Sequence, residues 1–133
     1  MITREADYAL RVVLCLADIP KGQSFSTATL AEQMNIPYRF LRRILRKLCA
    51  SGLVGSVRGK EGGVYLLEKP AKISVYDVLA VFDPKSILLN RCHEDGNSCQ
   101  RKKKCSVHIT MEPVQKLLNK QLKSINFANL AGK

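Results

Sequence analysis

The sequence predicts a mainly α-helical fold with one small β-hairpin, and three observations carry this prediction. The first half of the chain holds three segments whose apolar residues recur at the helical spacing of three and four positions. Two short β-prone runs around a glycine-rich loop follow them. The C-terminal part then returns to a helical apolar pattern. We therefore expect three helices, a hairpin and further helices, in that order.

The composition fits one compact domain with a small appendage and an anionic partner. The chain has 133 residues, of which 46% are hydrophobic, and this is enough for a core. Lys and Arg number 22 against 11 Asp and Glu, which gives a formal net charge of +11. Such an excess of cations favours nucleic acid as the partner, ahead of an acidic membrane surface.

The sequence also predicts where the protein works. No apolar run approaches the roughly 20 residues that a membrane span needs. The N-terminal residues 1–7 carry acids and lack the apolar stretch of a signal peptide. We therefore expect a cytoplasmic protein without a membrane partner, in which five cysteines are thiols or metal ligands rather than disulfides.

The first two helices are separated by clear stop and start signals. Residues 4–18 have a broad apolar face, and the proline and glycine of residues 20–22 end that helix. Ser26 offers an N-cap for a short helix over residues 27–34. A tight turn at residues 35–36 leads into the next helix. Helix, short turn and helix are the arrangement of a helix-turn-helix.

The third helix, from Pro37 to about Ser51, carries two opposed faces. Its apolar stripe consists of Leu41, Ile44, Leu45 and Leu48. The opposite face has no acid and carries Arg39, Arg42, Arg43 and Arg46. Like charges one turn apart repel each other, so a face of unpaired arginines is expected to bind an anionic partner. Because Arg binds phosphate and the guanine edge through two hydrogen bonds at once, this face predicts a DNA recognition helix. The alternative is a basic surface without a ligand.

The hairpin directly follows this basic helix, so we interpret it as a wing. Its strands are expected over residues 53–58 and 64–67, around the glycine-rich loop at residues 59–63. Arg58 and Lys60 lie at the tip, where they are expected to enter a minor groove or to contact the DNA backbone. The alternative is a structural hairpin with solvated cations.

Two further helices complete the expected fold. Ser74 is an N-cap for residues 75–82, and the Asp-Pro pair at residues 83–84 ends that helix. Residues 86–90 are expected to be extended, and a polar loop follows to Cys105. The last helix carries the apolar residues Val114, Leu117, Leu118, Leu122 and Ile125.

We interpret the apolar residues of the last helix as a dimer seam. The competing interpretation packs them back on their own domain. Pro113 requires that a helix running from Ser106 either kinks or starts there.

The polar loop concentrates cysteines with the spacing C-x6-C-x5-C, namely Cys92, Cys99 and Cys105. His93 and His108 lie beside them, whereas Cys15 and Cys49 fall within helical patterns and are expected in the core. Soft thiolates in one loop favour zinc or an iron–sulfur cluster. The loop lacks the close C-x2-C pairs of most zinc knuckles. A thiol–disulfide switch and surface thiols without function stay open as alternatives.

Three parts of the chain together resemble the IscR/NsrR-type iron–sulfur regulators of the Rrf-two superfamily. They are Asp-Tyr-Ala-Leu-Arg at residues 7–11, the stretch over residues 53–63, and the three-cysteine loop. The resemblance runs over about residues 1–130. It implies a homodimeric winged-helix repressor whose three loop cysteines hold an iron–sulfur cluster. The state of that cluster is then expected to control DNA affinity in response to iron, nitric oxide or redox conditions.

The resemblance leaves two candidates for a fourth cluster ligand. In IscR-like members a His three residues past the last cysteine completes a [2Fe–2S] site, and His108 matches it. In NsrR-like members an Asp on the first helix of the partner subunit completes a [4Fe–4S] site, and Asp7 matches that position. We favour His108 and [2Fe–2S]. The arginines at positions 39, 42 and 43 depart from IscR proteins, so we expect a different operator.

These observations divide the chain into three parts and define a function. They are a winged helix-turn-helix DNA-binding domain at residues 1–83, a cysteine-rich cluster-binding loop at 84–107, and a dimerisation helix with tail at 108–133. We expect a homodimer on a double-stranded DNA operator, with no small-molecule substrate. The sequence has no Cys-x-x-Cys, phosphate loop or Ser/His/Asp arrangement, so we expect no enzyme. The alternative is a winged-helix DNA- or protein-binding module with a structural zinc site or a thiol redox switch.

Overall fold

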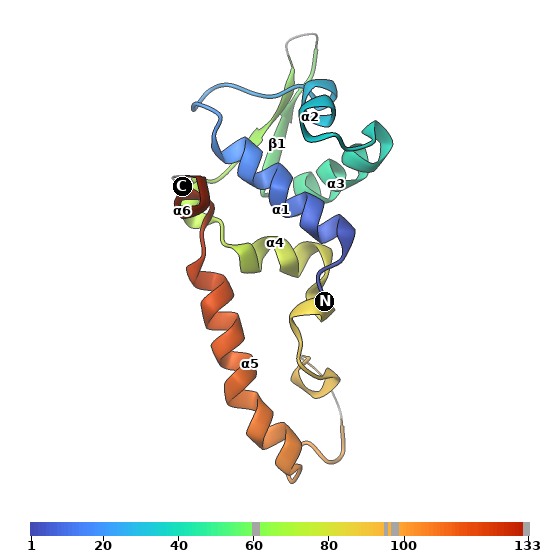
Figure 1. Cartoon of the computed structure of the whole chain (residues 1–133), viewed down its shortest axis with the longest axis vertical. Coiled ribbons are helices and arrows are strands. Elements are labelled where there is room, and N and C mark those ends of the chain that lie inside the picture. The colour runs from blue at the N-terminus through green and yellow to red at the C-terminus, as the bar shows by residue number, and fades with distance from the viewer. Residues whose placement is uncertain (60–61, 95, 97–98, 132–133) are drawn as a thin grey trace.

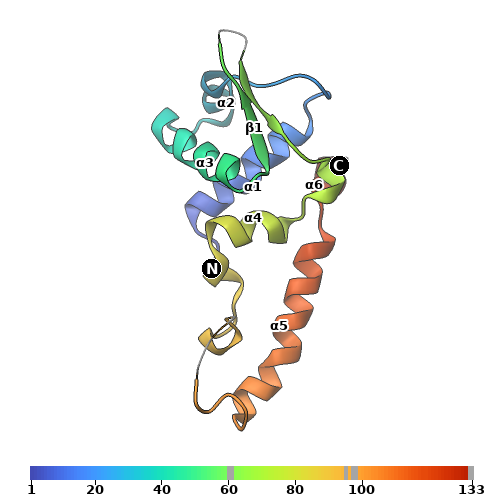
Figure 2. The ribbon, with the colours of Figure 1, turned by 180° about the vertical axis from the view of Figure 1, so that it is seen from behind.

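The computed structural model describes residues 1–59, 62–94, 96 and 99–131. It confirms a mainly helical fold with one antiparallel hairpin, and it places the hairpin and α5 at opposite ends of the molecule (Figures 1 and 2). The elements in chain order are α1 (Arg4–Ala17), α2 (Thr27–Met34), α3 (Tyr38–Ala50), β1 (Val54–Val57), β2 (Gly63–Leu66), η1 (Pro70–Lys72), α4 (Val75–Phe82), η2 (Pro84–Ile87), η3 (Arg91–His93), α5 (Ser106–Ser124) and α6 (Phe127–Ala131), where η marks a 3₁₀ helix.

The helix-turn-helix forms through the caps that its sequence encodes. The Ser26 hydroxyl accepts a hydrogen bond from the backbone N–H of Thr29 at 3.0 Å and so starts α2. Asn35 ends α2 in the left-handed conformation at φ 53°, which Asn tolerates better than most residues. Pro37 is the N-cap of α3 rather than its first helical residue, so the expected start is corrected by one position.

The hairpin is held against the helical part by close backbone contact. Val54 pairs with Leu66 and Val57 with Gly63. Phe25 adds a bridge on the other side of β2, because its N–H donates to the Val64 carbonyl at 3.0 Å and its carbonyl accepts from Val64 at 2.7 Å. A Cβ on Gly63 would lie 2.1 Å from the Phe25 oxygen, so this approach requires glycine.

One apolar core joins α1, α2, α3, the hairpin and α4. Its fully buried side chains include Leu41, Ile44 and Leu48 of α3. Phe127 of α6 is also fully buried in it, since the chain returns to the domain after α5. The Phe127 N–H donates to the Ile73 carbonyl at 3.0 Å. From the sequence these last residues are expected to form part of a tail, and their packing in the core was not predicted.

The segment between α4 and α5 is not the extended stretch that we expected at residues 86–90. Pro84 to Ile87 form η2, because proline presets φ for a tight turn and the Ser86 N–H donates to the Asp83 carbonyl at 3.0 Å. The turn buries Ile87 in a second apolar cluster with Ala6 and Leu79, against which Leu122 packs.

α5 runs away from the domain as a long arm with Pro113 inside it (Figure 1). The helix therefore starts at Ser106 and not at the proline. Leu122 packs on its own chain. At this position the structure therefore agrees with the competing interpretation, in which the apolar residues of the last helix pack back on their own domain. Val114 and Leu117 are 46% and 67% exposed. No helix in the described part of the chain has the length and apolar character needed to cross a membrane.

Candidate functional site

The basic face of α3 is exposed, as the sequence predicts. Its exposed arginines are Arg39, Arg42, Arg43 and Arg46. Among the described residues none of the four forms an ion pair with an acid. The Arg42 guanidinium carbon lies 5.9 Å from the ring centroid of Tyr38, and that of Arg43 lies 5.1 Å from the ring of Phe40. These cation–π contacts orient two cations while leaving their charge uncompensated.

Lys47 belongs to the same helix but serves a different purpose. Its Nζ lies 2.7 Å from the Glu5 Oε1 of α1 and 5.7 Å from the centre of the Phe82 ring. This cation therefore fixes α3 against α1 and α4. Its charge is compensated within the chain, in contrast to the four arginines.

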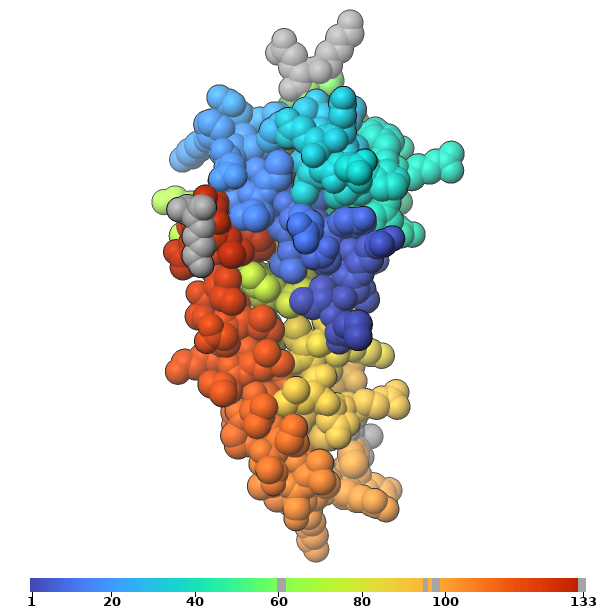
Figure 3. All heavy atoms as spheres, viewed as in Figure 1, coloured from blue at the N-terminus to red at the C-terminus, as the bar shows by residue number. Residues whose placement is uncertain are grey.

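The wing carries the remaining predicted cations. Arg58 follows β1 directly and is exposed, whereas Lys60 lies outside the described residues. Side chains of α3 project from the same half of the molecule as the hairpin (Figure 3). The two basic elements are therefore both remote from the far end of α5.

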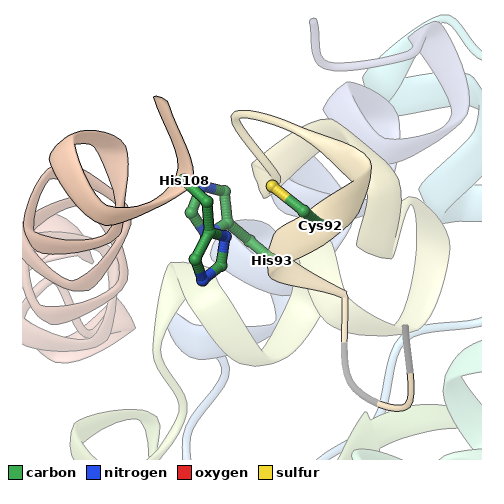
Figure 4. A group of neighbouring side chains, drawn as sticks. All are labelled: Cys92, His93 and His108. Atoms are coloured by element: carbon green, nitrogen blue, oxygen red, sulfur yellow. The ribbon is translucent and has the colours of Figure 1, made fainter. Parts of the chain in front are cut away.

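A second group of functional side chains lies between η3 and α5. Cys92 and His93 come from η3, and His108 comes from the start of α5. Each offers one possible ligand atom, and these three atoms lie within 4.8 Å of one another. The two imidazole rings stack with centroids 4.8 Å apart and 22° between their planes, and the Cys92 sulfur points toward them (Figure 4).

Both imidazoles carry a buried nitrogen that has no hydrogen-bond partner among the described residues. These atoms are Nε2 of His93 and Nδ1 of His108, and His108 is only 8% exposed. An unsatisfied buried polar atom costs about 1–3 kcal/mol. A nitrogen lone pair held in this way beside a thiol is suited to a metal.

The other nitrogen of His108 faces a carboxylate. Nε2 lies 3.8 Å from the Oε2 of Glu112, one turn along α5. Glu112 Oε1 lies in turn 3.6 Å from the Nζ of Lys116. A carboxylate beside one ring nitrogen favours the proton there, so the other nitrogen is left as a lone-pair donor.

The structure brings together only part of the predicted ligand set. Cys92 and His108 lie in the three-residue group, whereas Cys99 and Cys105 do not. Cys105 is half-buried and is the N-cap residue of α5, so it lies one helical turn before His108. Cys99 is exposed. Asp7 lies on α1, outside the group, and its carboxylate accepts a hydrogen bond from the Arg11 Nε at 3.1 Å.

Gln115 holds the ligand segment in place. This side chain is 5% exposed. Its oxygen accepts a hydrogen bond from the Leu89 N–H at 2.7 Å, and its nitrogen donates to the Ile87 carbonyl at 2.7 Å. The amide therefore ties the backbone just before Cys92 to the middle of α5.

Cys15 and Cys49 pack against the main core, as predicted. Burial raises the pKa of both thiols, and the nearby Asp18 carboxylate adds to the rise in the pKa of Cys15. A thiol kept protonated is a poor metal ligand. Their role is therefore in packing.

Three residues of this site were not predicted as members of it from the sequence, namely Gln115, Glu112 and His93. Two of them had a readable signal. Gln115 is a polar residue on the α5 face that also carries Leu118 and Leu122, and Glu112 follows His108 at the i,i+4 spacing that brings side chains together. His93 stands next to Cys92 in the sequence, but its contact with His108 depends on how η3 folds against α5.

Comparison with known proteins places the chain among regulators of transcription. The model of the Rrf2 family, described as an iron-dependent transcriptional regulator, matches residues 2–133. An rrf2-like HTH-type regulator of Rhodobacter capsulatus is 32% identical over 114 residues, which are 80% of this chain and 76% of that protein. The regulator NsrR of Shouchella clausii is 29% identical over 98 residues, 74% of this chain and 66% of that protein. These relatives are not enzymes, as predicted for this chain.

Solved structures confirm the winged-helix fold. CymR, the global cysteine regulator of B. subtilis, has a TM-score of 0.78 at 23% identity and covers 99% of this chain and 96% of its own. IscR of T. potens has a TM-score of 0.75 at 24% identity and covers 98% of this chain and 85% of its own. At these identities the likeness establishes the fold.

Proposed function

The chain belongs to the Rrf2 family of DNA-binding transcriptional regulators, and on that premise we propose a homodimeric repressor whose DNA affinity depends on an iron–sulfur cluster. The observation that carries the proposal is the buried Nδ1 of His108, which has no hydrogen-bond partner among the described residues and belongs to a residue grouped with Cys92. The description of the family as iron-dependent supports it, as does the likeness to a relative named NsrR. Iron, nitric oxide and redox state are the candidate signals.

The donor set fits a cluster. Three thiolates and one neutral imidazole match the soft ligands that bind iron–sulfur groups, and we assign them to Cys92, Cys99, Cys105 and His108. When bound, the cluster supplies a redox-active centre that is lost or modified under oxidants and nitric oxide. The chain's own part is to bring ligands of η3 and α5 together. We prefer His108 and a [2Fe–2S] cluster because this residue lies in the group with Cys92 and its Nδ1 is buried without a partner among the described residues.

Asp7 of the partner subunit is the competing fourth ligand and would suit a [4Fe–4S] cluster. Within its own chain this carboxylate is 47% exposed, and among the described residues its ion-pair partner is Arg11. Such a surface pair is worth little, so Arg11 leaves the carboxylate available. His108→Ala and Asp7→Ala, each reconstituted anaerobically, distinguish the two.

On DNA, we assign Arg39, Arg42 and Arg43 to the major groove and Arg58, with Lys60, to a minor groove or the backbone. The neighbouring Arg46 is assigned to phosphate. Arginines without acidic partners retain their full charge for phosphate, and their planar donors match the guanine edge. Because Tyr38 and Phe40 orient two of them, they lose less side-chain freedom on binding.

A chain of direct contacts connects the ligand segment to the recognition helix. Gln115 holds the backbone at Ile87, whose side chain packs on Ala6 of α1. The neighbouring Glu5 pairs with Lys47 of α3 at 2.7 Å. We propose that a change in the segment at residues 87–93 is transmitted to α3 through these packed side chains and this ion pair, a contiguous network of the kind that carries coupling between sites.

The dimer seam is assigned to the exposed face of α5. Val107, Val114 and Leu117 are spaced by seven and three residues and are 60%, 46% and 67% exposed. Apolar residues at this spacing form the stripe of a two-helix seam. Because Leu122 packs on its own chain, the assignment omits it.

The proposed function is tested by cluster assembly on the full chain. Anaerobic reconstitution followed by iron and acid-labile sulfide assays should give a stoichiometric cluster with visible absorption. Cys99→Ser and Cys105→Ser should lose it, whereas Cys15→Ser should retain it as the matched cysteine control. If the wild-type chain takes up neither iron nor sulfide, or if Cys15→Ser loses the cluster as fully as the loop variants, the assignment is wrong.

A further inference from the structure

The group between η3 and α5 contains a histidine that the proposed cluster does not use. We infer that the cluster-free chain binds one divalent transition-metal ion of the zinc class through Cys92, His93 and His108. This inference goes beyond the proposed cluster and shares two ligands with it. His93 belongs to the zinc site alone, and Cys99 belongs to the cluster alone.

The distances fit such an ion. Zinc holds sulfur at about 2.3 Å and imidazole nitrogen at about 2.0–2.1 Å in tetrahedral geometry, so neighbouring ligand atoms lie roughly 3.3–3.6 Å apart. The three candidate atoms already lie within 4.8 Å of one another. Atoms at the upper limit of 4.8 Å must approach one another by about 1.2–1.5 Å, through side-chain rotation, to reach that spacing. The rings must tilt away from their present stacking, since both nitrogens have to aim at one point.

The unpartnered nitrogens supply a driving force. Nε2 of His93 and Nδ1 of His108 are buried, and neither has a hydrogen-bond partner among the residues that the structure describes. A bound ion satisfies both lone pairs at once. The sulfur and imidazole donors select zinc over magnesium or calcium, which prefer oxygen.

Glu112 completes the arrangement from the second layer. The Nε2 of His108 lies 3.8 Å from the Glu112 carboxylate, and we place the proton on this nitrogen, which leaves the buried Nδ1 for the metal. Carboxylate, histidine and metal in this order are a common arrangement at zinc sites, where the carboxylate orients the ring and raises its basicity. Glu112 is therefore a positioning residue for the ion.

The shared ligands make the two occupants exclusive. Cys92 and His108 cannot serve a cluster while they hold zinc. A zinc-loaded chain is thus a state that must release its ion before it accepts a cluster, and the supply of zinc affects how readily the regulator is loaded.

The test is titration of the cluster-free, reduced full-length chain with Zn²⁺ against a chromophoric chelator, with Co²⁺ as a spectroscopic probe. We expect one ion per chain and a thiolate-to-cobalt charge-transfer band. His93→Gln should weaken zinc binding by more than about 100-fold, and Glu112→Gln by about 10-fold, as expected for a ligand and for an outer-layer partner. Cys99→Ser should bind zinc like the wild type. Circular dichroism confirms that each variant is folded.

The same variants separate this inference from the proposed cluster. His93→Gln should still assemble the cluster, and Cys99→Ser should not. If His93→Gln binds zinc with wild-type affinity, the zinc site is wrong. It is also wrong if Cys99→Ser loses as much zinc affinity as His93→Gln, since the loop thiolates would then hold the ion. If zinc binds as expected but the wild-type chain never assembles a cluster, the proposed function fails and the zinc site stands.

Discussion

Replacing Gln115 with Leu removes the two hydrogen bonds that hold the ligand segment on α5. The Ile87 carbonyl loses a buried hydrogen bond, and the Leu89 N–H loses a partly buried hydrogen bond. Together these losses cost about 2–4 kcal/mol, and the apolar surface of Leu offsets about 1 kcal/mol of that. The net cost of about 1–3 kcal/mol corresponds to roughly 5- to 150-fold easier opening of the segment.

Native-state hydrogen exchange measures this opening directly. Amides of residues 87–93 should exchange about 5- to 150-fold faster in Gln115→Leu, whereas the core of α3 should be unchanged. Gln33→Leu makes the same chemical change on an exposed position of α2 and is the matched control. The cluster should also be lost faster from Gln115→Leu. Equal exchange at residues 87–93 in both variants would refute the role of Gln115 as the clamp of the ligand segment.

Three further predictions test the other parts of the account. Arg46→Ala should flatten the log–log salt dependence of DNA binding by about one unit, because its side chain is assigned to phosphate, and an unchanged slope in a filter-binding series removes it from that contact. Leu117→Asp should give a monomer by light scattering, because it places a charge in an apolar seam; a persistent dimer moves the seam elsewhere. Burial raises the pKa of Cys15 and Cys49, so at neutral pH both thiols should be alkylated more slowly than an unhindered thiol, and the rate of alkylation should rise with pH. Mass spectrometry measures this rate, and rapid labelling of either thiol at neutral pH would contradict its burial.

Features that depend on local sequence were predicted well. Ser26 and Ser74 act as N-caps at the expected positions, because a cap is decided by residues within one turn. In α3 the periodicity separates a buried from an exposed face, and the structure has the arginines on the exposed one. The spacing of the cysteines marked the loop, whereas the role of His108 as a ligand came from the resemblance to IscR-like regulators and stays a prediction.

Features that depend on distant contacts were not predictable in the same way. Phe127 becomes a core residue only because the chain turns back after α5, and nothing in its neighbours indicates that return. The stacking of His93 on His108 arises from the docking of η3 on α5, fifteen residues apart in the chain. Residues 86–87 adopt a 3₁₀ turn rather than a strand because Pro84 and the Asp83 carbonyl favour it over their β-propensity.

The central claim is that the ligand segment controls DNA affinity. Fluorescence anisotropy under anaerobic conditions measures the DNA affinity of one sample before and after the cluster is removed. The DNA is a duplex that the reconstituted protein has selected from a random library. The account predicts that affinity for this duplex changes by about tenfold or more between the two states, within the range of coupling between linked sites. It also predicts that Cys99→Ser shows no such difference. Equal affinity of the wild-type chain in both states would contradict the account.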